Sequence, residues 1–464
     1  MRSGLALVVC ASLLSACSSA SVAPSFIAPY HASAPIGAAP GGTLSLLHGD
    51  SVTVAPHLLA ADQSVSLDYS GSSTDTPPNA AWSVAPGVLT ISMPQGTGVA
   101  ANAAQASYDY AHPPVGLHVV MAYEADNAAA IESAKAPLVT FVTAQASRRI
   151  VLHGTFDTVA HTVTLDIPQP MLAGVTSVRI ALGETNASAS APAFGGKIWQ
   201  PGLIYGGTWN PNFNLWGTSA RTLVVIHGIF SSVETAYDCA NSYLSTTANG
   251  SSTAPYSYQQ IFGFDYDYAQ PPDVEAPLFA AFINKLGLTN YDIEAHSYGT
   301  LVTLGALPKL AVRPNRTVLV GGPLPLRGSP IADPSNVLLR DLLLTLAAET
   351  ISSPAQIDEA IQSGMVASLA TNSPALTTLL NGVKGMAPYP NIERVAGTQE
   401  YDVEQLFWGP LKDAGVDVTA WDGVVEESAA LSTGLTATRQ TTIPYAHMGE
   451  PCDQPTIDFV TSAL

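Results

Sequence analysis

The stretch that most constrains the fold of this chain runs from residue 289 to 305 and reads TNYDIEAHSYGTLVTLG. A strand-like run ends at Ala295, and a helix-like run begins near Tyr298. Ser297 lies between them and is flanked, two positions away on each side, by Ala295 and Gly299. A serine at the tip of a sharp strand-to-helix turn has a strained backbone, so both flanking positions must be small. The pattern predicts an accessible hydroxyl at a helix N-terminus, where the helix dipole favours charge developing on a substrate oxygen.

Such a serine needs partners elsewhere in the chain. A hydroxyl becomes nucleophilic near neutral pH when a base takes its proton, and the base needs a carboxylate to orient it. In hydrolases built on this turn the chain order is Ser, acid, His, and of the ten histidines only His447 follows Ser297. Asp422, in the tight Asp-Gly turn 25 residues before His447, is the preferred acid, and Asp402 is the alternative. These residues predict an acyl-transfer triad.

Acyl transfer also requires backbone N–H donors for the oxyanion. One is expected from the residue after the nucleophile, Tyr298, and the other from the loop that follows the apolar strand 222–226. That loop reads HGIF, and Ile229 is the preferred donor, with Phe230 as the alternative.

Several segments together resemble the α/β-hydrolase superfamily: VVIHGIF, AHSYGTLV, GGPLPLRGSP, SPALTTLL, DGVV and the final histidine. The sequence looks similar to bacterial lipases with an AHSxG turn and to the GPI-inositol deacylase-like group. The resemblance covers roughly residues 200–464. It implies a serine hydrolase that cleaves carboxylic esters of lipids, with no metal or organic cofactor. One departure is Glu426-Glu427, where lipases often have proline or another apolar residue.

The spacing of apolar residues predicts at least two domains. Short alternating runs separated by turn residues over 46–195 predict one or two β-sandwich modules. Strand and helix patterns then alternate over 196–464, which predicts a mainly parallel sheet with helices on both faces. Residues 334–390 interrupt this alternation with consecutive helical patterns, and we expect either a cap over the site or a structural insertion.

The N-terminus predicts export. Arg2 and the apolar run 5–14 have the anatomy of a signal peptide over residues 1–16 and are too short to span a bilayer. The sequence Leu-Ser-Ala-Cys that ends at Cys17 resembles a bacterial lipobox, which implies a lipid anchor in the membrane; the alternative is an ordinary secretory signal. Residues 17–45, rich in Ser, Ala, Pro and Gly, predict a flexible linker.

Composition excludes some partners. The chain has 464 residues with 36 acidic against 17 basic side chains, a net charge of -19, and no cluster of Lys and Arg for nucleic acid. Outside the N-terminal segment the cysteines are Cys239 and Cys452, which predict a disulfide in an oxidising compartment. Metal ligation is not expected, because Cys239 has no Cys or His close by and His447 is assigned to the triad.

The triad predicts acyl chemistry without defining the acyl group. An ester hydrolase acting on lipid or acyl-ester substrates is the leading hypothesis. An amidase, a polyester depolymerase or an acyltransferase on the same triad stays open, as does a non-catalytic surface adhesion or interaction protein.

Overall fold

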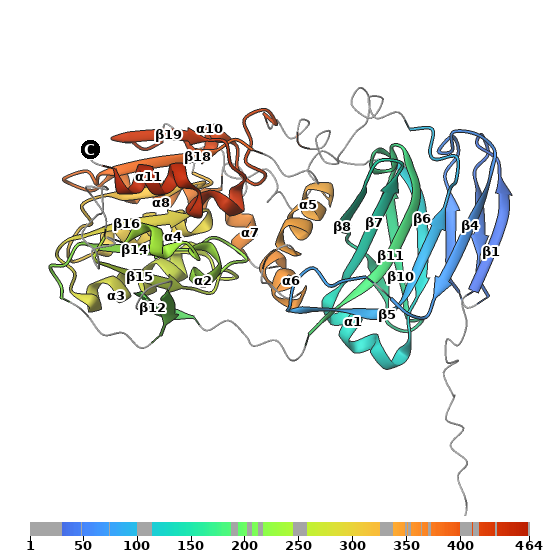
Figure 1. Cartoon of the computed structure of the whole chain (residues 1–464), viewed down its shortest axis with the longest axis horizontal. Coiled ribbons are helices and arrows are strands. Elements are labelled where there is room, and N and C mark those ends of the chain that lie inside the picture. The colour runs from blue at the N-terminus through green and yellow to red at the C-terminus, as the bar shows by residue number, and fades with distance from the viewer. Residues whose placement is uncertain are drawn as a thin grey trace, which may run out of the picture.

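The structure is a computed structural model. It describes residues 30–47, 49–73, 75–99, 114–186, 194–201, 207–211, 217–244, 258–324, 337–348, 350, 354–362, 364–369, 373–399, 411, 417–431 and 434–462. An all-β part comes first in the chain and a part built on a mixed sheet with helices follows it (Figure 1). Within the described residues, no helix combines the length and apolar character needed to cross a bilayer.

The all-β part is a sandwich of two antiparallel sheets, with strand orders β1-β4-β5-β11-β7-β8 and β2-β3-β6-β10-β9. In β4, alternate side chains from Val65 through Leu67 to Tyr69 are buried, as expected for a strand with one face on a core. The strands are β1 Tyr30–Ile36, β2 Gly42–Ser45, β3 Ser51–Val54, β4 Gln63–Ser70, β5 Trp82–Ser92, β6 Val115–Ala122, β7 Ala136–Thr143, β8 Ser147–Val151, β9 Thr155–Asp157, β10 Thr162–Pro168 and β11 Val175–Thr185. A short helix, α1 (Ala128–Ala134), precedes β7.

The first strand corrects the prediction of a flexible linker over residues 17–45. β1 pairs antiparallel with β4 along its whole length, and β2 begins at Gly42. Ala and Ser residues give little hydrophobic signal, but an edge strand is held by backbone hydrogen bonds to one neighbour. The sandwich therefore begins at Tyr30 and not near residue 46. The predicted signal peptide over 1–16 and Cys17 lie outside the described residues.

The second part is organised on an eight-stranded sheet with the order β13-β12-β15-β14-β16-β17-β18-β19. The strands from β15 to β19 in this order run parallel, and β12 and β13 add an antiparallel edge. Every residue of β14 and β16 is buried, the pattern of strands covered on both faces. The strands are β12 Gly195–Pro201, β13 Gly207–Asn210, β14 Thr222–Ile226, β15 Gln260–Asp265, β16 Tyr291–His296, β17 Thr317–Val320, β18 Ile392–Gly397 and β19 Arg439–Ile443.

Alternate residues of β14 show how the two faces are covered. Val224 and Ile226 belong to the core cluster that holds the buried residues of α3 (Pro272–Leu286) and α4 (Tyr298–Ala306). Leu223 and Val225 belong to a second cluster with α2 (Val233–Ala236) and α11 (Gln454–Thr461). Helices thus lie on both faces of the sheet, and the nucleophile turn is at the end of a central strand.

The sequence pattern also predicts a loop-rich lead-in over 198–216, a helix over 233–244 and a strand at 417–418, and the structure corrects all three. In the lead-in, β12 extends to Pro201 and β13 follows it. The predicted helix over 233–244 is only α2 followed by a 3-10 turn, η4 (Ala240–Tyr243). The strand predicted at 417–418 is wrong, because residues 418–420 form a turn and bend. The strand in this region is β19, whose residues Arg-Gln-Thr-Thr-Ile are too polar to give a strand signal.

The insertion between β17 and β18 consists of helices among its described residues: α5 Val337–Ala348, α6 Pro354–Gln362, α7 Gly364–Leu369 and α8 Pro374–Lys384. α8 packs on α4, the helix that follows Ser297. α5 lies instead against the edge strand β8 of the sandwich (Figure 1). Thr345 accepts a hydrogen bond from the Val151 N–H at 3.0 Å, and Asp341 accepts one from the His153 N–H at 2.9 Å. The insertion therefore joins the two parts of the molecule.

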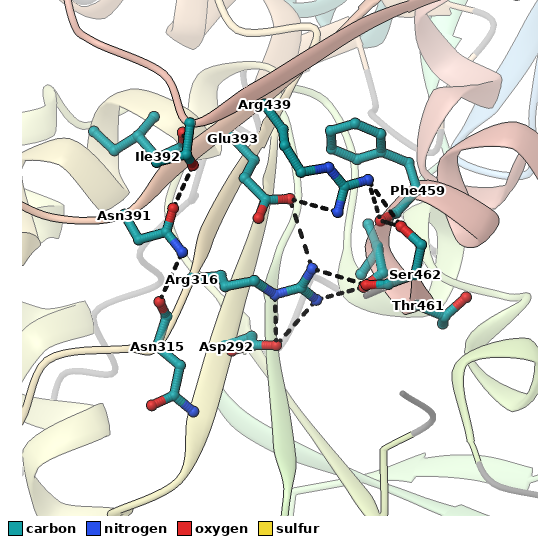
Figure 2. Close-up of polar contacts among 12 residues, drawn as sticks. Asp292, Asn315, Arg316, Asn391, Ile392, Glu393, Arg439, Phe459, Thr461 and Ser462 are labelled. Carbon is teal, nitrogen blue, oxygen red and sulfur yellow. Dashed lines mark hydrogen bonds and ion pairs between the residues drawn. The ribbon is translucent and has the colours of Figure 1, made fainter. Parts of the chain in front are cut away.

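A buried ionic network holds the last helix against the sheet (Figure 2). The Glu393 carboxylate lies between two guanidinium groups, 3.6 Å from Arg316 Nη1 and 3.6 Å from Arg439 Nη1. Arg316 also donates to Asp292 at 3.1 Å and to the Val460 carbonyl, and Arg439 donates to the Ser462 hydroxyl at 2.8 Å. The two guanidinium groups lie at the C-terminal end of α11, where positive charge interacts favourably with the negative end of the helix dipole.

Candidate active site

The nucleophile turn has the backbone that the sequence predicts. Ser297 directly follows β16 and precedes α4, with φ 51° and ψ -125°. This left-handed region is costly for a residue with a side chain and is found mainly where a site requires it. The Ser297 N–H donates to the Val320 carbonyl of β17 at 2.9 Å, which fixes the turn to the sheet.

Two glycines let the neighbouring backbone approach Ser297. A Cβ at Gly299 would overlap the His227 carbonyl oxygen. A Cβ at Gly228 would lie 2.7 Å from the Ser297 Cβ and 3.2 Å from its Oγ. The loop after β14 is therefore packed directly on the serine, as an oxyanion loop must be.

The structure brings the predicted base and the preferred acid together in a buried contact. His447 Nδ1 lies 2.8 Å from Asp422 Oδ2, and the His447 N–H also donates to the Asp422 carbonyl at 2.8 Å. The other carboxylate oxygen, Oδ1, accepts from the N–H groups of Val424 at 2.8 Å and Val425 at 2.6 Å. These donors hold the carboxylate so that Nδ1 carries the ring proton. His447 Nε2 is then left as an acceptor, and it is buried without a hydrogen-bond partner among the described residues.

A second histidine ties the base to the nucleophile turn. His296, the residue before Ser297, donates from Nε2 to the His447 carbonyl at 2.8 Å, and the two ring centroids are 4.8 Å apart. Burial, and then the neighbouring His447, lower the pKa of His296 well below its ordinary value, so the ring is neutral. Sequence analysis assigned no role to His296, although its place beside the nucleophile was visible.

The loop that carries the proposed oxyanion donors is rigidly held. The His227 ring stacks on Tyr266 with centroids 4.5 Å apart, and the Tyr266 hydroxyl donates to the His227 carbonyl at 3.0 Å. Burial lowers the pKa of His227, and its neutral ring lies 2.6 Å through Nδ1 from the Gly228 carbonyl. Ile229 and Phe230 follow, both buried, and Phe230 has φ 57°. Tyr298 begins α4, where the backbone N–H groups point toward the site.

The disulfide joins both sides of the site. Cys239 and Cys452 are bonded, and Cys452 ends the 3-10 helix η8 (His447–Cys452) that begins with the base. Beneath it, the Tyr243 hydroxyl bonds to the Pro451 carbonyl and to Glu294 Oε1 at 3.0 Å. The segment that carries His447 is thereby fastened to the helical turn after the oxyanion loop.

Within the part of the chain that the structure describes, two groups of side chains come close enough to offer ligands to a metal ion: Asp238, Cys239 and Cys452, and His296, His447 and Glu450. In the first, the two sulfur atoms are bonded to each other. In the second, His447 Nδ1 is engaged with Asp422, and His296 Nε2 with a carbonyl. We assign no metal ligand in either group.

Among the predicted site residues, the structure places Ser297, Tyr298, Ile229, Asp422 and His447 at the same end of the parallel sheet. The alternative acid Asp402 lies outside the described residues. Sequence analysis missed Glu450, which is fully buried with its Oε2 3.8 Å from His447 Nδ1. A Cβ at Gly397 would lie within 2.9 Å of both the Glu450 and the Asp422 side chains, so the two acids share this space. The spacing of Glu450, three residues after the predicted base, was the signal available.

Comparison with known proteins gives likenesses in the second part of the chain. A domain of unknown function, DUF7379, matches residues 209–397. No protein of curated function matches significantly. Several solved structures are similar to about half of this chain. They are the Bacillus licheniformis lipase BlEst2 (16% identity, 55% of this chain, 96% of that chain, TM-score 0.38), an α/β-hydrolase fold protein from Burkholderia ambifaria (15%, 51%, 87%, 0.32) and a lipase-esterase related protein from Clostridium acetobutylicum (12%, 50%, 88%, 0.33).

Proposed function

We propose that this protein is a serine hydrolase that cleaves carboxylic esters through an acyl-enzyme. Ser297 attacks the ester carbonyl while His447 Nε2 takes its proton, and Asp422 stabilises the imidazolium that forms. The N–H groups of Tyr298 and Ile229 bind the oxyanion. His447 then returns the proton to the departing alcohol, and water, activated by the same base, releases the acid.

One observation carries this proposal. His447 Nδ1 is bonded to a buried, doubly anchored carboxylate, and its Nε2 has no partner among the described residues. The His447 carbonyl is bonded to His296, the residue directly before Ser297 and its strained backbone. Most buried ring nitrogens are hydrogen-bonded, and a neutral ring whose Nδ1 is held by a carboxylate while its Nε2 is unpartnered is in the form needed to accept a proton. A glycine would adopt the positive φ of residue 297 at little cost. The presence of a serine there therefore indicates that its hydroxyl is needed.

The test is hydrolysis of soluble p-nitrophenyl esters by the wild-type protein and by Ser297→Ala. We expect the variant to fold and to lose hydrolysis together with covalent labelling by a fluorophosphonate. Equal hydrolysis by the two proteins would contradict the proposal. Soluble and emulsified esters of increasing acyl length would then separate an esterase from a lipase.

We also propose that the protein is exported and anchored in a membrane through lipid on Cys17. The signal-peptide anatomy and the lipobox-like sequence support this, and the disulfide is in keeping with an oxidising compartment. Cys17→Ser should move the protein from the membrane fraction to the soluble fraction. Unchanged membrane association would argue against the anchor.

A further inference from the structure

A second acidic residue is buried at the triad. Glu450 lies in η8, one turn after His447, and its side chain is fully buried. Its Oε2 is 3.8 Å from His447 Nδ1 and 3.7 Å from His296 Nε2. The chain leaves space for this side chain at the ends of two strands, because a Cβ at Gly321, directly after β17, or at Gly397, the last residue of β18, would overlap one of its oxygens. Glu450 is therefore built into the site.

The charges around Glu450 do not support two ionised carboxylates. Among the described residues, the ion pairs of Asp422 and Glu450 involve only histidines and no Lys or Arg. His296 is neutral and donates to a carbonyl, and Asp453 at the start of α11 adds another acidic group nearby. Only one of the two buried carboxyl groups can be charged.

The hydrogen bonds decide which one is charged. Asp422 has three N–H partners, from Val424, Val425 and the His447 ring, and these favour its carboxylate form. Among the described residues, the backbone donor that favours the charged form of Glu450 is the Gly397 N–H alone. Burial, followed by the negative charge of Asp422, raises the pKa of Glu450 well above its ordinary value. The proton between the two carboxyl groups belongs on Glu450.

We propose that Glu450 is a positioning residue of the triad: as a neutral carboxylic acid it donates a hydrogen bond to the Asp422 carboxylate and holds that carboxylate on His447 Nδ1. This inference rests on the proposed function for its catalytic consequence. Its structural content, a protonated Glu450 against an ionised Asp422, does not depend on any reaction. Glu450 touches no substrate and acts only through Asp422 and His447.

The test compares Glu450→Gln, which keeps a neutral donor of the same shape, with Glu450→Ala, which removes it. The exposed Glu359→Gln is the matched control. With a p-nitrophenyl ester, we expect Glu450→Gln to keep kcat within about twofold. We expect Glu450→Ala to lose kcat roughly 10- to 100-fold with little change in KM, because a small displacement of the catalytic groups has effects of this size. A Glu450→Gln variant as poor as Glu450→Ala would overturn the proposal.

A measurement that needs no turnover completes the test. At neutral pH the infrared C=O band of a protonated carboxyl group should be present in the wild-type minus Glu450→Gln difference spectrum and absent for Glu359→Gln. Absence of the band would overturn the proposal even if Glu450→Ala were too unstable to assay. If the band is present but the wild-type protein hydrolyses no ester, the proposed function fails and the assignment of the proton stands.

Discussion

His447 bonds to Asp422 twice, through its ring Nδ1 and through its backbone N–H, both at 2.8 Å. These two hydrogen bonds fix the orientation of the loop that carries His447 as well as the orientation of the His447 ring. A carboxylate that only oriented the ring would tolerate some movement of the loop. Here the backbone hydrogen bond also ties the two loops together. A substitution of the Asp422 side chain changes the ring contact and leaves the backbone contact in place, so it tests the role of the carboxylate.

Asp422→Asn should lower kcat for a p-nitrophenyl ester by roughly 10³- to 10⁴-fold, because an amide favours the wrong tautomer of the base. Asp417→Asn is the matched control, since that exposed carboxylate bonds to Thr419 in the same loop and does not contact His447. Asp402→Asn, at the alternative acid, should retain activity. Loss of activity in Asp402→Asn with activity kept in Asp422→Asn would reverse the assignment.

Gly299→Ala should disrupt the nucleophile turn, because its Cβ would overlap the His227 carbonyl oxygen. We expect a loss of ester hydrolysis and a lower melting temperature. Gly382→Ala, in α8, meets only Pro308 at 3.9 Å and should be neutral or stabilising by about 0.5–1 kcal/mol. Circular dichroism measures the melting temperatures of both variants, and an ester assay measures their activity. A fully active Gly299→Ala variant would contradict the packing of Gly299 on His227.

The double variant Cys239→Ser/Cys452→Ser should unfold more easily than the wild-type protein. The disulfide closes a loop with a sequence separation of 213, and removing such a link costs about 2–5 kcal/mol. Urea denaturation of the variant and of the oxidised wild type measures the difference. Reductant should destabilise the wild type and leave the variant unchanged; a reductant-dependent variant would indicate that another thiol is involved.

Glu294 makes the stability of the protein depend on pH. Burial raises the pKa of Glu294 to about 8 from an ordinary value near 4.5. Between these values the unfolded chain releases this proton and the folded chain keeps it, so stability falls as pH rises and levels off above about pH 8. Glu294→Gln should lack this contribution. Its free energy of unfolding, relative to wild type, should therefore rise between about pH 5 and pH 8; a constant difference would show that Glu294 is ionised in the fold.

The site was predictable where its signals are local or depend on chain order. The small residues beside Ser297 and the single downstream histidine follow directly from the sequence, and the structure brings His447 to Asp422. The spacing of Glu450 from His447 was visible in the sequence, but its burial was not, because the room for its side chain is left by glycines at the ends of two separate strands. Buried acids without a sequence motif are recognised only when their neighbours are known.

The fold shows the same division. Apolar runs such as 222–226 identify central strands, because both of their faces are buried. The sequence did not predict β1 and β19. Each is an edge strand with one neighbouring strand, so each needs few apolar residues and gives a weak strand signal. Pairing of such strands depends on partners distant in sequence, which composition and periodicity do not report.

The docking of α5 on β8 has a consequence for the protein in concentrated solution. β8 is the last strand of its sheet, and a free strand edge is a template on which another chain can add a strand. Thr345 and Asp341 occupy the outward N–H groups of Val151 and His153 and block that edge. The helical insertion between β17 and β18 thereby protects the sandwich from intermolecular strand addition and from the aggregation that would follow.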